Sequence, residues 1–316
     1  CFFENFLRSA CNFEGTTYRT GNRFYNNIVT NCSGGTASGY GDESYAVKID
    51  RQTSFVFDYN ICDETIRTIG YSGVAVGGLA GTNTLLFRNN HIYANYHNAT
   101  YWTFGVEFWY GVNPTMTGNT FVCEIDWGGF GCTGLTFSDN IVGPTSPIGR
   151  TAAGLQIEQY CEDIIISRNI FKNLELPIYF CNNWTIDKTD YIDNVEISVN
   201  LIYGVTGYSG GRGIFFETGS NDDAYYPPTS ISNIKIYNNT IVASTVSIAD
   251  YGILLPSQAR TSNVTNINVR NNIIIGFSSY AIYAYRQDND YTQAINTLNI
   301  TYNNYYGNGS NSAAFN

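Results

Sequence analysis

Short runs of alternating apolar and polar residues recur along the chain, and each run ends at an asparagine. The runs are rich in Ile, Val, Phe and Thr, and their period of two predicts β-strands. They cover residues 55–60, 85–90, 135–140, 164–169, 195–200, 234–239, 267–272 and 298–304. No long stretch has a period of 3.6 residues, so the sequence does not predict helices.

An asparagine returns about every thirty residues in the same apolar frame. The ten copies are Asn27, Asn60, Asn90, Asn119, Asn140, Asn169, Asn200, Asn239, Asn272 and Asn304. Repeats of this length predict a stacked solenoid. Because an amide side chain has a donor end and an acceptor end, stacked copies can form an internal hydrogen-bonded ladder. The alternative is ten unrelated asparagines in turns.

A second set of strands, most of them led by glycine, lies about 13–25 residues before the asparagines. These strands cover residues 45–50, 72–77, 104–109, 153–158, 176–181, 212–217, 251–256 and 280–285. A short apolar strand follows each asparagine. The shortest repeat, between Asn119 and Asn140, is expected to be a bare turn of the solenoid with tight geometry at Gly128 and Gly129.

This pattern resembles the right-handed parallel β-helix superfamily, which includes pectate-lyase-like and polygalacturonase-like enzymes and phage tailspikes. The resemblance covers roughly residues 18–306. It implies an all-β, single-stranded right-handed parallel β-helix of about ten coils, and it does not imply a function. We expect one domain over 1–316, with 1–17 as a partial first coil or cap and 307–316 as an incomplete last coil. The chain is expected to be a segment of a longer protein.

Composition narrows the range of partners. The net charge of −10 argues against nucleic acid, and no apolar stretch is long enough for membrane insertion. Only 13% of residues are charged while 16% are aromatic, which favours an extracellular, cell-surface or virion-surface protein that binds neutral polar partners. A genome rich in A and T would also favour Asn, Tyr and Ile.

Eight cysteines make disulfides plausible in a secreted chain. Sequence proximity suggests the pairs Cys1/Cys11, Cys32/Cys62, Cys123/Cys132 and Cys161/Cys181. The alternative is buried free thiols. Because no two cysteines are spaced as CxxC, a structural zinc site is not expected.

The outward side chains of the Gly-led strands are expected to form two columns. One contains Lys48, Ala75, Glu107, Gln156, Tyr179, Phe215, Leu254 and Tyr283, and the other contains Asp50, Gly77, Trp109, Glu158, Cys181, Glu217, Pro256 and Tyr285. Carboxylates beside aromatic rings suit a sugar-binding groove. The candidate binding residues are Glu107, Trp109, Gln156, Tyr179, Asp222, Asp223 and Tyr225.

Glu158 and Glu217 are the candidate catalytic residues. They fall in one column two coils apart, roughly 9–10 Å by strand stacking, which is close to the spacing in inverting glycosidases. The alternative is that these carboxylates are solvated surface charges. No cofactor is expected, although the pairs Asp222/Asp223 and Asp288/Asp290 are candidates for Ca²⁺ binding.

The sequence therefore predicts recognition of a polysaccharide or glycan along this face. Glycoside hydrolase or polysaccharide lyase activity on the bound polymer is a further hypothesis. The short motifs of polygalacturonases, pectate lyases and alginate epimerases are not recognisable. The alternative is a purely structural shaft in an adhesin, surface filament or phage fibre, with homo-oligomer or filament contacts.

Overall fold

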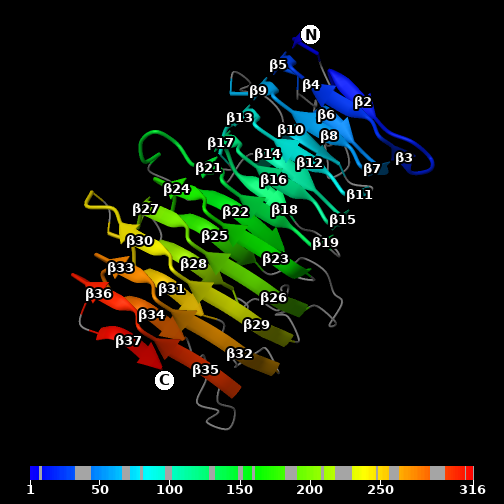
Figure 1. Ribbon diagram of the computed structural model, residues 1–316. Helices are drawn as coiled ribbons and strands as arrows, with labels where there is room; N and C mark the ends of the chain where they lie inside the picture. Colours follow the sequence, from blue (N-terminus) through cyan, green and yellow to red (C-terminus); the bar gives the residue numbers. More distant parts are fainter. Residues whose placement is uncertain are drawn as a thin grey trace.

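The strands stack side by side along one axis from the N-terminus to the C-terminus (Figure 1). The computed structural model describes residues 1–6, 9–32, 44–65, 72–78, 81–96, 102–127, 132–148, 152–158, 161–181, 191–207, 210–217, 230–246, 248–255, 263–284, 296–309 and 311–315. Within these residues every strand pairing is parallel and there is no helix. Three sheets of 11, 11 and 15 strands result.

Sheet A contains the short apolar strands that follow the asparagines. Its strands, in stacking order, are β1 (Phe2–Glu4), β5 (Ile28–Thr30), β9 (Ile61–Asp63), β13 (His91–Tyr93), β17 (Thr120–Val122), β21 (Ile141–Val142), β24 (Ile170–Lys172), β27 (Leu201–Val205), β30 (Thr240–Ala243), β33 (Ile273–Ile275) and β36 (Asn304–Tyr306).

Sheet B contains the Gly-led strands. Its strands, in stacking order, are β2 (Cys11–Phe13), β6 (Ser44–Ile49), β10 (Ser72–Gly78), β14 (Trp102–Phe108), β18 (Ile125–Trp127), β22 (Ala153–Glu158), β25 (Leu176–Cys181), β28 (Arg212–Phe216), β31 (Tyr251–Leu255), β34 (Tyr280–Ala284) and β37 (Asn311–Phe315).

Sheet C contains the strands that precede the asparagines, in two short pieces per coil at first and in one long strand later. They are β3 (Arg19–Thr20), β4 (Arg23–Tyr25), β7 (Gln52–Thr53), β8 (Val56–Asp58), β11 (Thr82–Asn83), β12 (Leu86–Arg88), β15 (Gly111–Val112), β16 (Thr115–Thr117), β19 (Cys132–Thr133), β20 (Thr136–Ser138), β23 (Cys161–Ser167), β26 (Tyr191–Ser198), β29 (Ser230–Tyr237), β32 (Asn263–Arg270) and β35 (Asn296–Thr301).

The chain passes from sheet A to sheet B to sheet C and then returns to sheet A one strand further along. For example, Ile28 of β5 lies in register with Ile61 of β9, which lies in register with His91 of β13. This winding confirms the predicted all-β parallel β-helix. Sheets A and B each contain eleven strands, compared with the expected ten coils or so, because β1, β2 and β37 extend the stack at its two ends.

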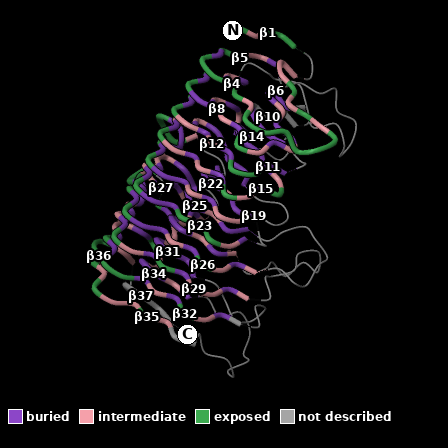
Figure 2. The backbone as a smooth tube through the Cα atoms, turned by 45° about the vertical axis from the view of Figure 1, so that its right-hand side comes forward, coloured by how far each residue is buried: buried purple, intermediate pink, exposed green. Residues whose placement is uncertain are grey.

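The interior is one continuous apolar core, which Figure 2 shows as buried segments along the whole stack. Fully or almost fully buried phenylalanines, most of them three residues before a ladder asparagine, form a column. Their ring centroids are 4.7–6.2 Å apart and the rings are stacked. The members of this column are Phe24, Phe57, Phe87, Phe121, Phe137 and Phe171, of which Phe121 and Phe171 lie two residues after an asparagine, on strands of sheet A.

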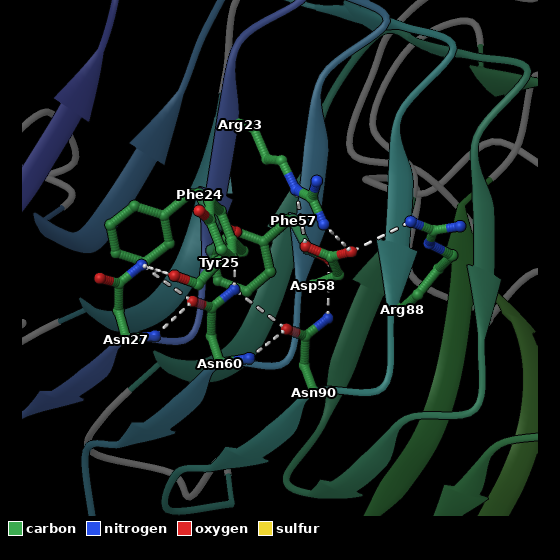
Figure 3. A network of polar contacts seen from close by, with 9 residues as sticks. All are labelled: Arg23, Phe24, Tyr25, Asn27, Phe57, Asp58, Asn60, Arg88 and Asn90. Carbon is green, nitrogen blue, oxygen red and sulfur yellow. Dashed lines mark hydrogen bonds and ion pairs between the residues drawn. The ribbon is translucent and has the colours of Figure 1, made fainter. Parts of the chain in front are cut away.

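The repeated asparagines form a ladder at the corner between sheets C and A, part of which is drawn in Figure 3. Each Nδ2 donates to the Oδ1 of the next asparagine at 2.9–3.1 Å. The same Oδ1 also accepts a hydrogen bond from the preceding asparagine's backbone N–H, as between Asn60 and Asn90 at 2.8 Å. The second amide hydrogen reaches a backbone carbonyl, as from Asn90 to Phe57 at 2.9 Å.

The last member of the ladder is Asn303, and the prediction of Asn304 is wrong by one residue. The Oδ1 of Asn303 accepts from Nδ2 of Asn272 at 2.9 Å. A residue with positive φ precedes ladder asparagines, and here that residue is Tyr302, at 58°. Asn304 comes one residue later and lies exposed in β36.

The shortest repeat is a complete coil. Its strands β17, β18, β19 and β20 reach all three sheets, and β18 pairs in parallel with β14 and β22. It is therefore a bare turn of the solenoid, as expected, and not an external hairpin. Gly128 and Gly129 lie outside the described residues.

All eight cysteines are free thiols, so the four suggested disulfide pairs are not formed. Six of them are buried, where a thiol packs as a small apolar group. Burial raises the pKa of the Cys132 thiol to about 12. A thiol that holds its proton so strongly is a poor nucleophile, which agrees with a packing role.

Asp58, one of the few buried charged residues, is held by two arginines from neighbouring coils (Figure 3). Its Oδ2 lies 2.9 Å from Nη2 of Arg23 and 3.0 Å from Nη2 of Arg88, and its side chain is 1% exposed. Asp58→Ala is expected to destabilise the protein by about 1–2 kcal/mol, because it removes charge-assisted bonds while the half-exposed arginines can still reach water. Denaturant unfolding measures this change.

A matched control is Asp139→Ala. Asp139 also pairs with an arginine, Arg168, at 2.8 Å, but both side chains are about half exposed. Exposed pairs contribute little because water screens them. A midpoint shift in Asp139→Ala as large as that in Asp58→Ala would show that burial is not what makes the Asp58 cluster stabilising.

Candidate functional site

The candidate site follows a row of outward side chains across sheet B, which we call the outer row. Its members are Lys48, Gly77, Glu107, Asp126, Gln156, Tyr179, Phe215, Leu254 and Tyr283, each in register with the next. Ala75 was predicted in this row, but Gly77 occupies it instead, since Gly77 is in register with Lys48 and Glu107. Asp126 was missing from the predicted row.

Asp126 lies at the centre of the site. It is 4% exposed and stands between Glu107 of β14 and Gln156 of β22. The Nε2 of Gln156 donates to Oδ1 of Asp126 at 3.5 Å. Burial, and then the negative charges of Glu158, Glu107 and Glu124, raise the pKa of Asp126 well above its usual value. Asp126 therefore keeps its proton at pH values where an exposed aspartate is ionised.

Glu107 is also buried, at 6% exposed, and a tyrosine holds it in place. The Tyr45 hydroxyl donates to Oε2 of Glu107 at 3.2 Å, although β6 and β14 are separated by β10. Gly77 of β10 makes this reach feasible, since a Cβ at this position would lie 2.6 Å from Cε1 of Tyr45. The glycine thus leaves room for the tyrosine ring to cross the intervening strand.

The predicted second column also exists in part. Glu158 lies in register with Cys181, and the backbone N–H of Glu217 donates to the carbonyl of Phe180, the neighbour of Cys181, at 2.8 Å. Glu158 and Glu217 therefore lie in one column on strands two apart, roughly 9–10 Å by strand spacing. Both are half-buried. Trp109 is half-buried and directly follows β14.

An aromatic cluster adjoins these carboxylates. The Tyr179 hydroxyl donates to Oε2 of Glu217. The Tyr179 ring stacks on Phe215 with centroids 5.2 Å apart, and the Arg212 guanidinium lies 4.5 Å from the Phe215 centroid. Burial is the main cause that raises the pKa of Tyr179, so its hydroxyl stays a hydrogen-bond donor.

Three further tyrosines extend the aromatic surface toward the C-terminus. Tyr251, Tyr280 and Tyr283 are half-buried and mutually stacked, with centroids 4.8–6.2 Å apart. Of these three tyrosines, only Tyr283 was predicted to lie on the outer face. The signal for the others is a tyrosine at the start of two successive strands of sheet B, at Tyr251 and Tyr280.

Several predicted residues are not part of the described structure. Asp222, Asp223 and Tyr225 lie outside the described residues, as do Asp288 and Asp290. In the part of the chain that is described, no group of three or more His, Cys, Asp or Glu side chains is arranged to hold a metal ion. The described residues also contain no helix suited to crossing a membrane.

The site can thus supply a protonated carboxyl group, nearby carboxylates and flat aromatic surfaces. Comparison of the sequence with protein families and with curated proteins finds no match. Solved structures with a similar fold include two variants of the periplasmic alginate epimerase AlgG. A double mutant is 12% identical with a TM-score of 0.35, covering 94% of this chain and 70% of its own. A single mutant is 10% identical with a TM-score of 0.28, covering 93% and 51%. Similarity at this level carries no argument about activity.

Proposed function

We propose that the protein binds a polysaccharide along the outer row of sheet B and hydrolyses it with Asp126 as the general acid and Glu158 as its partner. The observation that carries this proposal is a buried carboxyl group whose pKa is raised beside other carboxylates. Pairs of acidic groups with unequal proton affinity are the machinery of glycoside hydrolysis.

The contrast with Asp58 supports a functional role for Asp126. Asp58 is equally buried, and two arginines compensate its charge. The electrostatic neighbours that shift the pKa of Asp126 are three carboxylates, and their repulsion adds to the cost of burial. Such an arrangement opposes stability, and groups perturbed in this way are concentrated at active sites.

The chemistry follows from the two protonation states. Protonated Asp126 donates its proton to the glycosidic oxygen as the bond to the anomeric carbon breaks. On the opposite face of the sugar ring, the Glu158 carboxylate takes a proton from a water molecule whose oxygen forms the new bond to that carbon. The net reaction adds one water across the glycosidic bond. This chemistry uses no cofactor.

The carboxylate separation predicts the stereochemical outcome. Asp126 of β18 pairs with Gln156 of β22, and Glu158 lies two residues further along β22. Diagonal neighbours of this kind are about 7–8 Å apart, within the 6.5–9.5 Å separation of inverting enzymes. Glu158 and Glu217, roughly 9–10 Å apart by strand spacing, lie near the upper limit of that range. Inversion is therefore expected from either pair, and substitutions distinguish the two.

The remaining residues are proposed to bind the polymer. Tyr179 and Trp109 would stack on the apolar faces of sugar rings, while Glu107, Gln156 and Glu217 would accept or donate hydrogen bonds to hydroxyl groups. Asp222, Asp223 and Tyr225 are proposed to border this surface. A polymeric glycan as partner fits an extracellular, cell-surface or virion-surface location.

The proposal is tested by incubating the chain with a panel of polysaccharides and measuring new reducing ends. On the cleaved polymer, Glu158→Gln should lower kcat roughly 10²–10⁴-fold with little change in KM. NMR of the first product should show inversion. Wild-type turnover in Glu158→Gln, or retention in the product, would overturn the assignment. Loss of turnover in Glu217→Gln with turnover kept in Asp126→Asn would transfer the catalytic role to the Glu158 and Glu217 pair.

A structural shaft is the second candidate, supported by the unbroken core and ladder along the whole stack. It predicts that no polysaccharide in the panel is bound or cleaved. It also predicts that Trp109→Ala combined with Glu217→Gln changes no glycan binding. Specific binding of one polymer that this double variant abolishes would exclude a purely structural role.

A further inference from the structure

The outer face of sheet A exposes a long apolar column. Large hydrophobic side chains that are 37–77% exposed occur repeatedly on its strands, and Figure 2 shows exposed segments along this edge of the stack. They are Phe2, Ile28, Ile61, Ile141, Leu201, Tyr203, Ile273 and Tyr306. Six of them share one row, since Phe2, Ile28 and Ile61 are in register, and the row continues through His91, Thr120, Ile141, Ile170, Leu201, Thr240 and Ile273.

This face is almost free of charge over most of its length. From β17 to β36 in the described part of sheet A, the two outward rows contain a single charged side chain, Lys172. The row that contains Lys172 continues through Tyr203, Val242 and Ile275. A protein with a net charge of −10 therefore has one side where its charges are few.

The fold does not require this apolar face, because outward side chains do not contribute to the interior. Ten strand steps of about 4.8 Å give a face about 48 Å long, and its two rows of side chains are about 10–14 Å wide together, hence about 500–700 Å² of apolar and polar side chains together. Stable interfaces bury about 800 Å² on each partner, so this face with a polar rim is large enough for one.

We propose that a second copy of this chain packs along the outer face of sheet A. The side-chain rows repeat at the strand spacing of about 4.8 Å, and a second copy presents the same spacing, so the two surfaces can interleave over their full length. An isologous contact uses the same patch twice and brings two acidic molecules together where charge is least. A globular partner has no matching period.

The two functions of the molecule would then use different sides. The proposed contact lies on sheet A, and the outer row with Asp126 lies on sheet B. A pair formed in this way leaves the candidate site open. This inference is therefore independent of the proposed polysaccharide hydrolysis.

Sedimentation of the chain over a range of concentrations tests the contact. We expect dimers, and we expect Leu201→Lys combined with Ile273→Lys to weaken dimerisation at least a hundredfold. The matched control is Ile165→Lys, since Ile165 is similarly exposed, at 42%, but lies on sheet C. The control should dimerise like the wild-type chain.

A second pair, Leu201→Thr with Ile273→Thr, places β-branched residues, which favour strands, at both positions and separates a lost contact from a lost fold. It should also weaken dimerisation while the circular dichroism spectrum is unchanged. A chain that stays monomeric up to high concentration, or that dimerises equally well in both double variants, would overturn the proposal. So would binding of the monomer to neutral lipid vesicles through these residues.

Discussion

Replacing Asn200 with leucine is expected to destabilise the protein by about 3–6 kcal/mol. The Oδ1 of Asn200 accepts from both the backbone N–H and the Nδ2 of Asn169, at 2.9 and 3.0 Å. Its Nδ2 donates to the carbonyl of Ile166 at 2.9 Å and to Asn239 at 3.0 Å. Leucine leaves several buried polar groups without partners, each costing about 1–3 kcal/mol. Denaturant unfolding measures the loss.

Asn268→Leu is the matched control for this prediction. Asn268 lies on the outside of β32, where its Nδ2 donates to Oδ1 of Asn266 at an exposed position. Its loss leaves groups that water can reach, so the change should stay below about 0.5 kcal/mol. Equal effects at Asn200 and Asn268 would contradict a stabilising role that depends on burial.

Replacing Asp126 with asparagine is expected to remove turnover and at the same time stabilise the protein at neutral pH. Asparagine has no proton to donate, so kcat should fall roughly 10²–10⁴-fold. The pKa of Asp126 is raised in the folded state, so its favourable contribution is complete below the unfolded pKa and is lost as pH rises through the folded pKa. Asparagine is neutral throughout and avoids this loss.

Thermal unfolding at about pH 4 and about pH 8 measures the second effect. The melting temperature of Asp126→Asn should exceed that of the wild-type chain at the higher pH, and the difference should shrink at the lower pH. Asp58→Asn is the control with the opposite sign, since its charge pairs with Arg23 and Arg88. A destabilised Asp126→Asn at pH 8 would show that the charge of Asp126 is compensated in the folded protein.

The fold could be predicted because the interior repeats itself in the sequence. The asparagine and the phenylalanine before it occupy one corner in successive coils, so their spacing is visible without coordinates. At the doublet Asn303 and Asn304 the sequence offers two equal candidates, and the two hydrogen bonds that Asn272 donates to Oδ1 of Asn303 decide between them.

The candidate site was harder to predict because an alternating apolar and polar pattern does not reveal the register between neighbouring strands. A shift of two residues keeps every side chain on the same face of a strand. In β10 the alternation fits Val74 and Val76 equally well, and hydrogen bonding selects Val76 as the partner of Val106. Asp126 was not predicted as a site residue because its strand is preceded by Glu124 and not by a glycine. Its proton affinity depends on carboxylates from three coils, which no local pattern reveals.

The asparagine ladder has a direction, and this has a consequence for how such molecules change length during evolution. From Asn27 to Asn272 each side-chain amide donates to the Oδ1 of the next ladder asparagine toward the C-terminus, and Asn303 accepts the last of these bonds. Each inner coil therefore presents an amide oxygen as acceptor to the coil before it and an amide N–H as donor to the coil after it, as every other inner coil does. A gene duplication or deletion that adds or removes one whole repeat leaves these ends matched, even though repeat lengths vary from 21 residues, between Asn119 and Asn140, to 39, between Asn200 and Asn239. The number of coils is thus free to vary under selection without a compensating change in the ladder.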